Sequence, residues 1–403
     1  MSVSLGVIEI KRNKFLSAFV VLSLALCIVL TSCSNKGANQ QNESSQVISS
    51  EAIQSQEVSE IISSEITIES EPESTSAVQS ESKPTTSQPT SSTVSSTPAG
   101  PAPTQEKMVN GILIMGTRAL ELVGRNATQE KKYAEYVNKF ADDLSGTAKV
   151  YSMVIPKASV IYTADSIGYK NVAKNGAASL ENIKNNLTSA INVDAYTALN
   201  AHKGEEIYAR TDHHWTAYGA FYAAQEFAKV ANTSFDDIST YTVERRANYV
   251  GTMRKYTNGY YAIVNYPEDF IKLVPSTPYT AERYSSYFTN PQARDIFYHI
   301  SDSNVSSWYL TFIGGDSNFF KIKSQSCTNG RKLFIIKDSY GNALAPFFMG
   351  SFEEIYIVDL RELSINAINF VKEQGITDVL FAMCSYSALG SSINSRINTI
   401  RTM

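Results

Sequence analysis

The sequence is poor in cysteine, and this shortage excludes a disulfide-stapled scaffold. It has four cysteines among 403 residues, and two of them, Cys27 and Cys33, lie in an apolar segment at the N-terminus. Only Cys327 and Cys384 remain for the rest of the chain. A domain of this size buries a sufficient core without a crosslink, so we expect these two cysteines to be buried free thiols.

The chain also lacks an excess of basic residues. Its 35 Lys and Arg side chains are outnumbered slightly by 39 Asp and Glu side chains, which gives a net charge of −4. A nucleic-acid-binding domain needs a clustered positive surface to neutralise phosphates. The composition therefore predicts no nucleic-acid partner.

Aromatic residues are absent from residues 34–104. This stretch consists mainly of Ser, Thr, Glu, Gln and Pro, and it holds nine Glu against Lys36 and Lys83. Such a composition cannot bury enough apolar surface to offset the entropy lost on ordering. We expect residues 34–104 to be a disordered linker.

The N-terminus resembles a bacterial lipoprotein signal peptide. Lys11, Arg12 and Lys14 precede an apolar run that ends in Leu30-Thr31-Ser32-Cys33. This ending is similar to a lipobox, in which the cysteine thiol is lipidated and becomes the mature N-terminus. We expect residues 1–33 to be a signal peptide, with Cys33 anchoring an extracytoplasmic protein to the cell membrane. The alternative is an uncleaved signal anchor.

From residue 105 onward, the pattern of apolar and polar residues predicts one folded α/β domain. Apolar runs at 111–115, 149–155, 332–336, 356–358 and 379–382 predict strands, and 206–209 and 310–313 predict two more. Helical spacing appears at 129–144, 180–190, 217–231 and 365–374. Alternating strands and helices predict a parallel sheet covered on both faces. Residues 240–305 lack a clear period and are expected to form an insertion of loops and short strands.

Two polar segments follow predicted strands, where the reactive groups of such sheets lie. The first is Thr211-Asp212-His213-His214-Trp215, which holds two of only four histidines. A histidine beside a carboxylate is held in one tautomer and kept basic. The second is Lys337-Asp338-Ser339-Tyr340-Gly341-Asn342, where a strand enters a polar turn. Together they supply a nucleophile, a base and an orienting acid, with backbone N–H groups available for an oxyanion.

These segments resemble the DHHW family of secreted bacterial proteins, which is similar to the SGNH-hydrolase-like domains of alginate O-acetylation proteins. The resemblance covers residues 108–390 and includes Val154-Ile-Pro156, Phe312-Ile-Gly-Gly315 and Ile357-Val-Asp-Leu-Arg361. It implies a three-layer α/β/α, flavodoxin-like parallel sheet for residues 105–403. Because Asp and His precede Ser, it also implies a circular permutation of the ordinary order.

The resemblance implies catalytic roles for Ser339, His214 and Asp212, with no metal and no cofactor. His213 falls at a variable position of the motif, Trp215 is expected to pack beneath the site, and Tyr340, Asn342 and Gly315 are auxiliary candidates for shaping it. Gly315-Asp316-Ser317 is closer in sequence to the Gly-Asp-Ser block of SGNH hydrolases than Lys337-Asp338-Ser339 is. However, no helix is expected after Ser317, so we prefer Ser339 as the nucleophile. Other interpretations are an N-cap with structural histidines, or an Asp-His-His metal site.

The resulting functional hypothesis is an extracytoplasmic O-acetyltransferase or esterase. Its expected partners are a surface polysaccharide or wall glycan, the membrane through Cys33, and a membrane-bound acyl donor. The alternative is a non-catalytic glycan-binding or scaffold lipoprotein.

Overall fold

The computed structural model describes residues 105–403, apart from residue 286. The predicted signal peptide, the lipidated Cys33 and the predicted linker lie outside the described residues, so they remain predictions. Within 105–285 and 287–403, no helix combines the length and apolarity that a membrane crossing requires. Cys327 and Cys384 are both free and buried, as expected.

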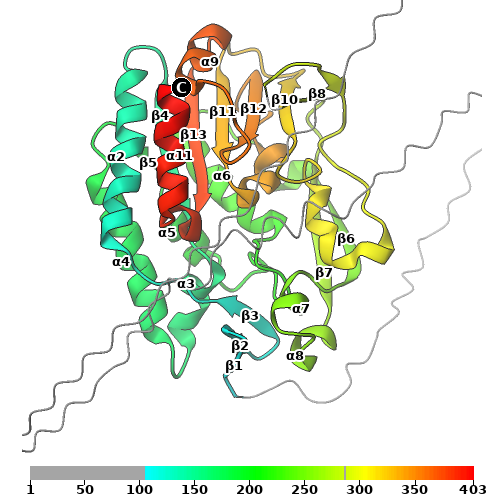
Figure 1. The fold of residues 1–403 in the computed structure, drawn as a ribbon. Helices are drawn as coiled ribbons and strands as arrows, with labels where there is room; N and C mark the ends of the chain where they lie inside the picture. Colours follow the sequence, from blue (N-terminus) through cyan, green and yellow to red (C-terminus); the bar gives the residue numbers. More distant parts are fainter. Residues whose placement is uncertain (1–104, 286) are drawn as a thin grey trace, which may run out of the picture. The chain divides into compact units, whose positions relative to one another are not determined.

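An eight-stranded sheet forms the centre of the fold, in the order β5-β4-β13-β11-β12-β10-β8-β9 (Figure 1). Its strands are β4 (Lys149–Ile155), β5 (Ile191–Asn192), β8 (Tyr279–Tyr284), β9 (Gln292–Ala293), β10 (Phe319–Ser324), β11 (Lys332–Lys337), β12 (Glu354–Asp359) and β13 (Asp378–Cys384). Strands β5, β4, β13, β11 and β12 are parallel, and β10, β8 and β9 continue the sheet antiparallel. The predicted parallel sheet is therefore a mixed, mostly parallel sheet.

The helices cover both faces of this sheet. The α-helices are α2 (Ala127–Asp143), α3 (Ala158–Tyr162), α4 (Lys170–Asn186), α5 (Ala195–Ala201), α6 (Ala217–Ala231), α7 (Met253–Tyr256), α8 (Tyr261–Val264), α9 (Ala367–Gln374), α10 (Ser385–Ala388) and α11 (Ser391–Thr402). The 3₁₀ segments are η2 (Thr163–Asp165), η3 (Ile238–Thr240), η4 (Asp302–Thr311) and η5 (Ser339–Phe347).

Alternate residues of each central strand enter two separate cores. On β11, Leu333 and Ile335 face the core that includes α5, α6 and η5, whereas Phe334 and Ile336 face the core of α2, α9 and α11. All of these side chains are buried. A strand buried on both faces reads as a continuous apolar run, which explains why β4, β11 and β13 were readable from sequence.

Two smaller sheets lie beside the central one. Strands β1 (Lys107–Val109), β2 (Ile112–Met115) and β3 (Arg118–Glu121) form an antiparallel meander, and β6 (Tyr241–Tyr249) pairs with β7 (Glu268–Pro275). Part of the first sheet packs with α7 and α8 in a third small core. The segment 240–305 is thus only partly an insertion, because β8 and β9 extend the main sheet.

Three element predictions need correction. Residues 310–313 are not a strand, because 302–311 form η4. The predicted strand at 206–209 is reduced to one bridge between Tyr208 and Trp215. The helix expected at 180–190 is the second half of α4, which begins at Lys170 and ends at Asn186.

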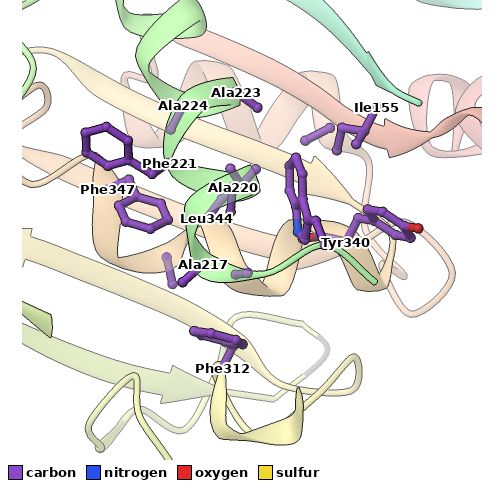
Figure 2. Close-up of a cluster of buried hydrophobic side chains, with 14 of the residues drawn as sticks. Ile155, Ala217, Ala220, Phe221, Ala223, Ala224, Phe312, Tyr340, Leu344 and Phe347 are labelled. Carbon is purple, nitrogen blue, oxygen red and sulfur yellow. The ribbon is translucent and has the colours of Figure 1, made fainter. Parts of the chain in front are cut away.

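Helix α6 packs closely on the sheet (Figure 2) and begins two residues after Asp212-His213-His214-Trp215. The side of this helix that faces the core carries Ala217, Ala220, Ala223 and Ala224, all buried. These small residues let the helix backbone approach the sheet, while Phe221 fills the remaining space with an edge-on contact to Phe347, ring centroids 5.7 Å apart. The start of α6 is thereby fixed within the fold.

On the same helix, Gly219 packs against Ile207 and Trp215, and replacing it tests how closely the helix approaches these residues. A Cβ at Gly219 would lie 2.3 Å from the Ile207 carbonyl oxygen and 3.0 Å from Trp215 Cβ. Although alanine favours helix, we expect Gly219→Ala to lower the free energy of unfolding by about 1–3 kcal/mol through overpacking. Gly204→Ala, where the added Cβ meets nothing within 4 Å, is the matched control. Equal urea-denaturation midpoints for both variants would contradict the expectation.

Candidate active site

The histidine-bearing loop lies between Tyr208 and Thr216 and is fixed from two sides. At its base, the Thr216 N–H donates to the Ile207 carbonyl (3.1 Å), and the Ala209 N–H donates to the His214 carbonyl (3.3 Å). From β7, the Glu268 carboxylate accepts the N–H groups of Arg210 and Thr211 and the Thr211 hydroxyl. The loop therefore presents Asp212, His213 and His214 without regular secondary structure of its own.

The serine-bearing turn follows β11, one of the central strands. Asp338 caps η5, accepting from the Tyr340 N–H (3.0 Å) and, through its second oxygen, from the Cys384 N–H at the end of β13 (2.8 Å). Gly341 is required here, because a Cβ would lie 2.3 Å from Lys337 Cβ. Ser339 is consequently held at the carboxyl edge of the sheet, at the start of η5.

The structure brings Ser339, His214 and Asp212 into one hydrogen-bonded chain. His214 Nε2 lies 2.9 Å from Ser339 Oγ, and His214 Nδ1 lies 2.7 Å from Asp212 Oδ1. A carboxylate only accepts hydrogen bonds, so His214 carries its proton on Nδ1 and turns the Nε2 lone pair to the serine hydroxyl. This is the tautomer that a general base for Ser339 requires.

Asp212 is saturated by protein donors. Its Oδ1 accepts from His214 Nδ1 and from the His214 N–H (3.0 Å), and its Oδ2 accepts from the N–H and the hydroxyl of Thr252, both 2.8 Å away. Burial acts to raise the pKa of Asp212, but the neighbouring His213 and His214 and these hydrogen bonds hold that pKa well below its ordinary value. The carboxyl is therefore ionised at neutral pH.

The hydrogen bonds that saturate Asp212 also decide between a catalytic triad and an Asp-His-His metal site. Ligand atoms of Asp212, His213 and His214 lie within 4.8 Å of one another, as in a metal site. However, both oxygens of Asp212 are occupied, and the Nδ1 atoms of both histidines face protein oxygens, in His213 that of Thr252 at 2.7 Å. The donor set fits an orienting acid and its base better than it fits a metal ion.

Aromatic groups join the two loops beneath the triad. The Tyr309 ring stacks on the His214 ring, centroids 3.7 Å apart and planes 2° apart, and its hydroxyl lies 3.1 Å from the carbonyl oxygens of Ser339 and Tyr340. Trp215 Nε1 donates to the same Tyr340 carbonyl (2.9 Å). Trp215 therefore packs beneath the site, and its indole fixes the distance between histidine and serine.

The auxiliary candidates have other partners. The Tyr340 hydroxyl donates to the His213 carbonyl, and the Asn342 amide donates to Asp316 (2.8 Å), so neither side chain is available to an oxyanion in this arrangement. The Ser339 N–H, at the start of η5, makes no hydrogen bond with any described residue. It is the oxyanion donor that the geometry offers.

The Gly315-Asp316-Ser317 segment lies apart from the histidines. Gly314 and Gly315 have φ of +71° and +98°, a region that favours glycine. The Asp316 carboxylate binds Arg361 (2.6 Å) as well as Asn342, and Ser317 is exposed. Among the described residues, the serine that contacts His214 is Ser339.

Three contributors have no signal in the sequence: Thr252, Tyr309 and Glu121. Lys157 follows a predicted strand, and the sequence favours a solvated surface charge there over a contact to an anionic glycan, which its burial contradicts. Lys157 is 5% exposed, pairs with Glu121 and donates to the His213 carbonyl (3.3 Å). These residues lie on four segments with no shared motif, so spacing alone does not reveal them. The structure also shows why glycine precedes Thr252: a Cβ at Gly251 would lie 2.4 Å from Asp212 Cβ.

The DHHW protein family model matches residues 40–358, and the chain belongs to this family. No curated protein matches the sequence significantly.

One solved structure is a member of the same family, and a second shares the fold. A DHHW family protein from Eubacterium siraeum DSM 15702 is 40% identical, with a TM-score of 0.66 over 73% of this chain and 97% of that one. Bacillus cereus PatB1, in a structure with a sulfonyl adduct, is 16% identical, with a TM-score of 0.58 over 72% of this chain and 98% of its own. The O-acetyltransferase domain of Pseudomonas putida AlgJ matches at 11% identity over 68% and 90% of the two chains, with a TM-score of 0.37.

Burial of His213 predicts a pH dependence of stability. Burial, and next the proximity of His214, lower the pKa of His213 to about 4. Between this value and the ordinary value of about 6.5, the unfolded chain binds more protons, so the free energy of unfolding falls as the pH falls from about 6.5 to 4. We expect this group to account for about 2–3 kcal/mol of the loss.

Urea denaturation at pH 7 and pH 4.5 measures this difference. His213→Asn should lose less stability on acidification than the wild type, whereas His299→Asn, which removes an exposed histidine, should behave like the wild type. The same loss in all three proteins would show that His213 does not titrate as stated.

Proposed function

We propose that this DHHW protein is an extracytoplasmic acyl-transfer enzyme that uses Ser339 as nucleophile. The observation that carries the proposal is the hydrogen-bonded chain from Asp212 through His214 to Ser339, with distances of 2.7 and 2.9 Å. Loops that had only to cap a helix or bury a histidine would not need the serine at the imidazole nitrogen. The likeness to PatB1, at 16% identity, supports the fold alone.

The reaction has two halves. Ser339 Oγ attacks an acyl carbonyl while its proton moves to His214 Nε2, and the leaving alcohol then takes that proton as the acyl–oxygen bond breaks. In the second half, the acceptor hydroxyl attacks the acyl-serine, its proton passes through His214 Nε2, and Ser339 Oγ is released with a proton. Asp212 stays ionised throughout and stabilises the imidazolium, while the Ser339 N–H faces the developing oxyanion.

The substrate that we propose is an O-acetyl ester on a surface polysaccharide or wall glycan. Transfer to a sugar makes the protein an O-acetyltransferase, and transfer to water makes it an esterase. The lipobox-like Leu30-Thr31-Ser32-Cys33 supports placement outside the cell, anchored to the membrane near an acyl donor. A circular permutation of the SGNH order is part of the same proposal.

Cys384 does not compete for the role of nucleophile. It is buried beside the turn, and burial, followed by the charge of Asp338, raises the pKa of its thiol to about 12. A thiol that stays protonated at neutral pH is a poor nucleophile.

The adduct experiment decides whether Ser339 is a nucleophile. Intact mass spectrometry of the purified protein, quenched early after addition of an activated acetyl ester, should show an acetyl-sized increase in the wild type and none in Ser339→Ala. A sulfonyl fluoride provides a second covalent probe, expected to stop at the same serine. A folded wild type with neither adduct nor hydrolysis would instead support the alternative, a glycan-binding lipoprotein that does not turn over.

Thr252 provides a test of the orienting carboxylate. Its hydroxyl and N–H both hold Asp212 Oδ2, and the hydroxyl also contacts His213 Nδ1. Thr252→Val therefore removes one of the two bonds to Asp212, together with the contact to His213, while leaving the backbone. We expect kcat for a chromogenic acetyl ester to fall about tenfold to a hundredfold, with KM little changed. Thr252→Ser should restore most of the rate, whereas equal losses in both variants would exclude the hydroxyl as the cause.

A further inference from the structure

His213, the first histidine of the motif, is not used in the reaction steps above, yet it lies against the base. The centroids of the His213 and His214 rings are 3.8 Å apart. The side chain of His213 is 13% exposed, whereas that of His214 is 7% exposed and lies between Asp212 and Ser339. His213 is therefore the more exposed imidazole of the pair.

The hydrogen bonds fix the tautomer of His213. Thr252 Oγ1 has one hydrogen, which it donates to Asp212 Oδ2, because that carboxylate can only accept. The contact of 2.7 Å between Thr252 Oγ1 and His213 Nδ1 must then be donated by the histidine. A neutral His213 that carries its proton on Nδ1 has an unprotonated Nε2, which is a hydrogen-bond acceptor.

This Nε2 atom has no partner inside the protein. Within the part of the chain that the structure describes, no group donates a hydrogen bond to His213 Nε2, although the His213 carbonyl accepts from both Lys157 and Tyr340. The backbone of His213 is thus held firmly, and its ring is fixed through Nδ1. An acceptor held in this way and left open next to the base is suited to a ligand that donates a hydrogen bond.

The surroundings indicate what kind of donor fits. Tyr256 meets the His213 ring edge-on at 6.4 Å, Glu121 is 30% exposed, and Tyr386 is 45% exposed and close enough to Glu121 to interact with it electrostatically. The carboxylate of Glu121 is ionised, because Lys157, His213 and His214 outweigh the effect of burial and lower its pKa. A second acceptor and aromatic surface beside His213 favour a neutral polyhydroxyl group and disfavour an anion.

We propose that His213 Nε2 forms the acceptor subsite of this enzyme and binds the hydroxyl adjacent to the attacking hydroxyl of a saccharide. This inference rests on the acyl-transfer function proposed above. In the second half of the reaction, one hydroxyl donates its proton to His214 Nε2 and attacks, while its neighbour donates a hydrogen bond to His213 Nε2 and transfers no proton. When water is the acceptor, its second hydrogen takes the same position.

The test separates acylation from deacylation, because His213 enters only after the acyl-serine has formed. With 4-nitrophenyl acetate, the burst of nitrophenolate reports acylation, and the later steady rate reports deacylation to water or to added methyl β-D-glucopyranoside. His213→Asn keeps an amide N–H near the position of Nδ1 for Thr252 and removes the acceptor at Nε2. We expect acylation to fall by no more than about threefold and deacylation to fall about tenfold or more.

A second variant distinguishes subsite from scaffold. His213→Gln places an amide oxygen near the position of Nε2, so it should recover part of the deacylation rate that His213→Asn loses. An unchanged deacylation rate in His213→Asn, or equal losses in acylation and deacylation, would overturn the subsite while leaving the Ser339 mechanism intact. If the wild type itself gives no burst and no acetyl adduct, the proposed function fails, and this inference fails with it.

Discussion

The hydrogen bond between His214 and Ser339 is the contact on which the site depends, and it joins residues 125 positions apart. The histidine-bearing loop has no regular structure of its own, and Ser339 is the first residue of η5, so the distance between them is set by the elements packed behind them. Ser339 follows a strand buried on both faces, and His214 precedes a helix packed on the same sheet through alanines. Because such cores are close-packed, a shift of either loop would have to disturb the interior. The close packing of the sheet therefore holds His214 Nε2 and Ser339 Oγ at their separation of 2.9 Å.

Two backbone carbonyl groups also hold the histidine-bearing loop and the serine-bearing turn together. The Tyr340 carbonyl receives both Trp215 and Tyr309, and the His213 carbonyl receives both Lys157 and Tyr340. Each loop therefore donates to the backbone of the other, and two chain segments outside both loops complete the set. The buried charged side chains near the site also have partners: Lys337 lies between Asp359 (3.1 Å) and Asp316 (3.8 Å), and Lys157 pairs with Glu121. Charges taken out of water are tolerated only when paired in this way, and they fix local geometry in return.

Sequence reasoning found the parts of the fold that have a strong local signal. The strands β4, β11 and β13 are nearly continuous apolar runs, and α6 begins and ends at the residues that its spacing predicts. It failed where tertiary contacts decide the outcome. Residues 310–313 have strand composition but lie in and just after a 3₁₀ segment that places Tyr309 under His214. The antiparallel strands β8, β9 and β10 have short, mixed sequences, and only their pairing defines them: β10 pairs with β12, β8 with β10, and β9 with β8.

The candidate site likewise contains residues that the sequence predicts and residues that only tertiary contacts reveal. Asp212, His214 and Ser339 were recognisable because each has reactive chemistry at a predicted strand end, and the structure places them together. Thr252 was not recognisable, because a threonine in a loop carries no signal until its hydroxyl is seen between Asp212 and His213. The Asp212 carboxylate can only accept, so it holds His214 with its proton on Nδ1 and takes the single hydrogen of the Thr252 hydroxyl. His213 must then donate to Thr252 through Nδ1, and both imidazoles present a lone pair at Nε2. Two adjacent histidines with the same tautomer then differ in what their Nε2 atoms face: that of His214 meets the serine, and that of His213 has no hydrogen-bond donor among the described residues.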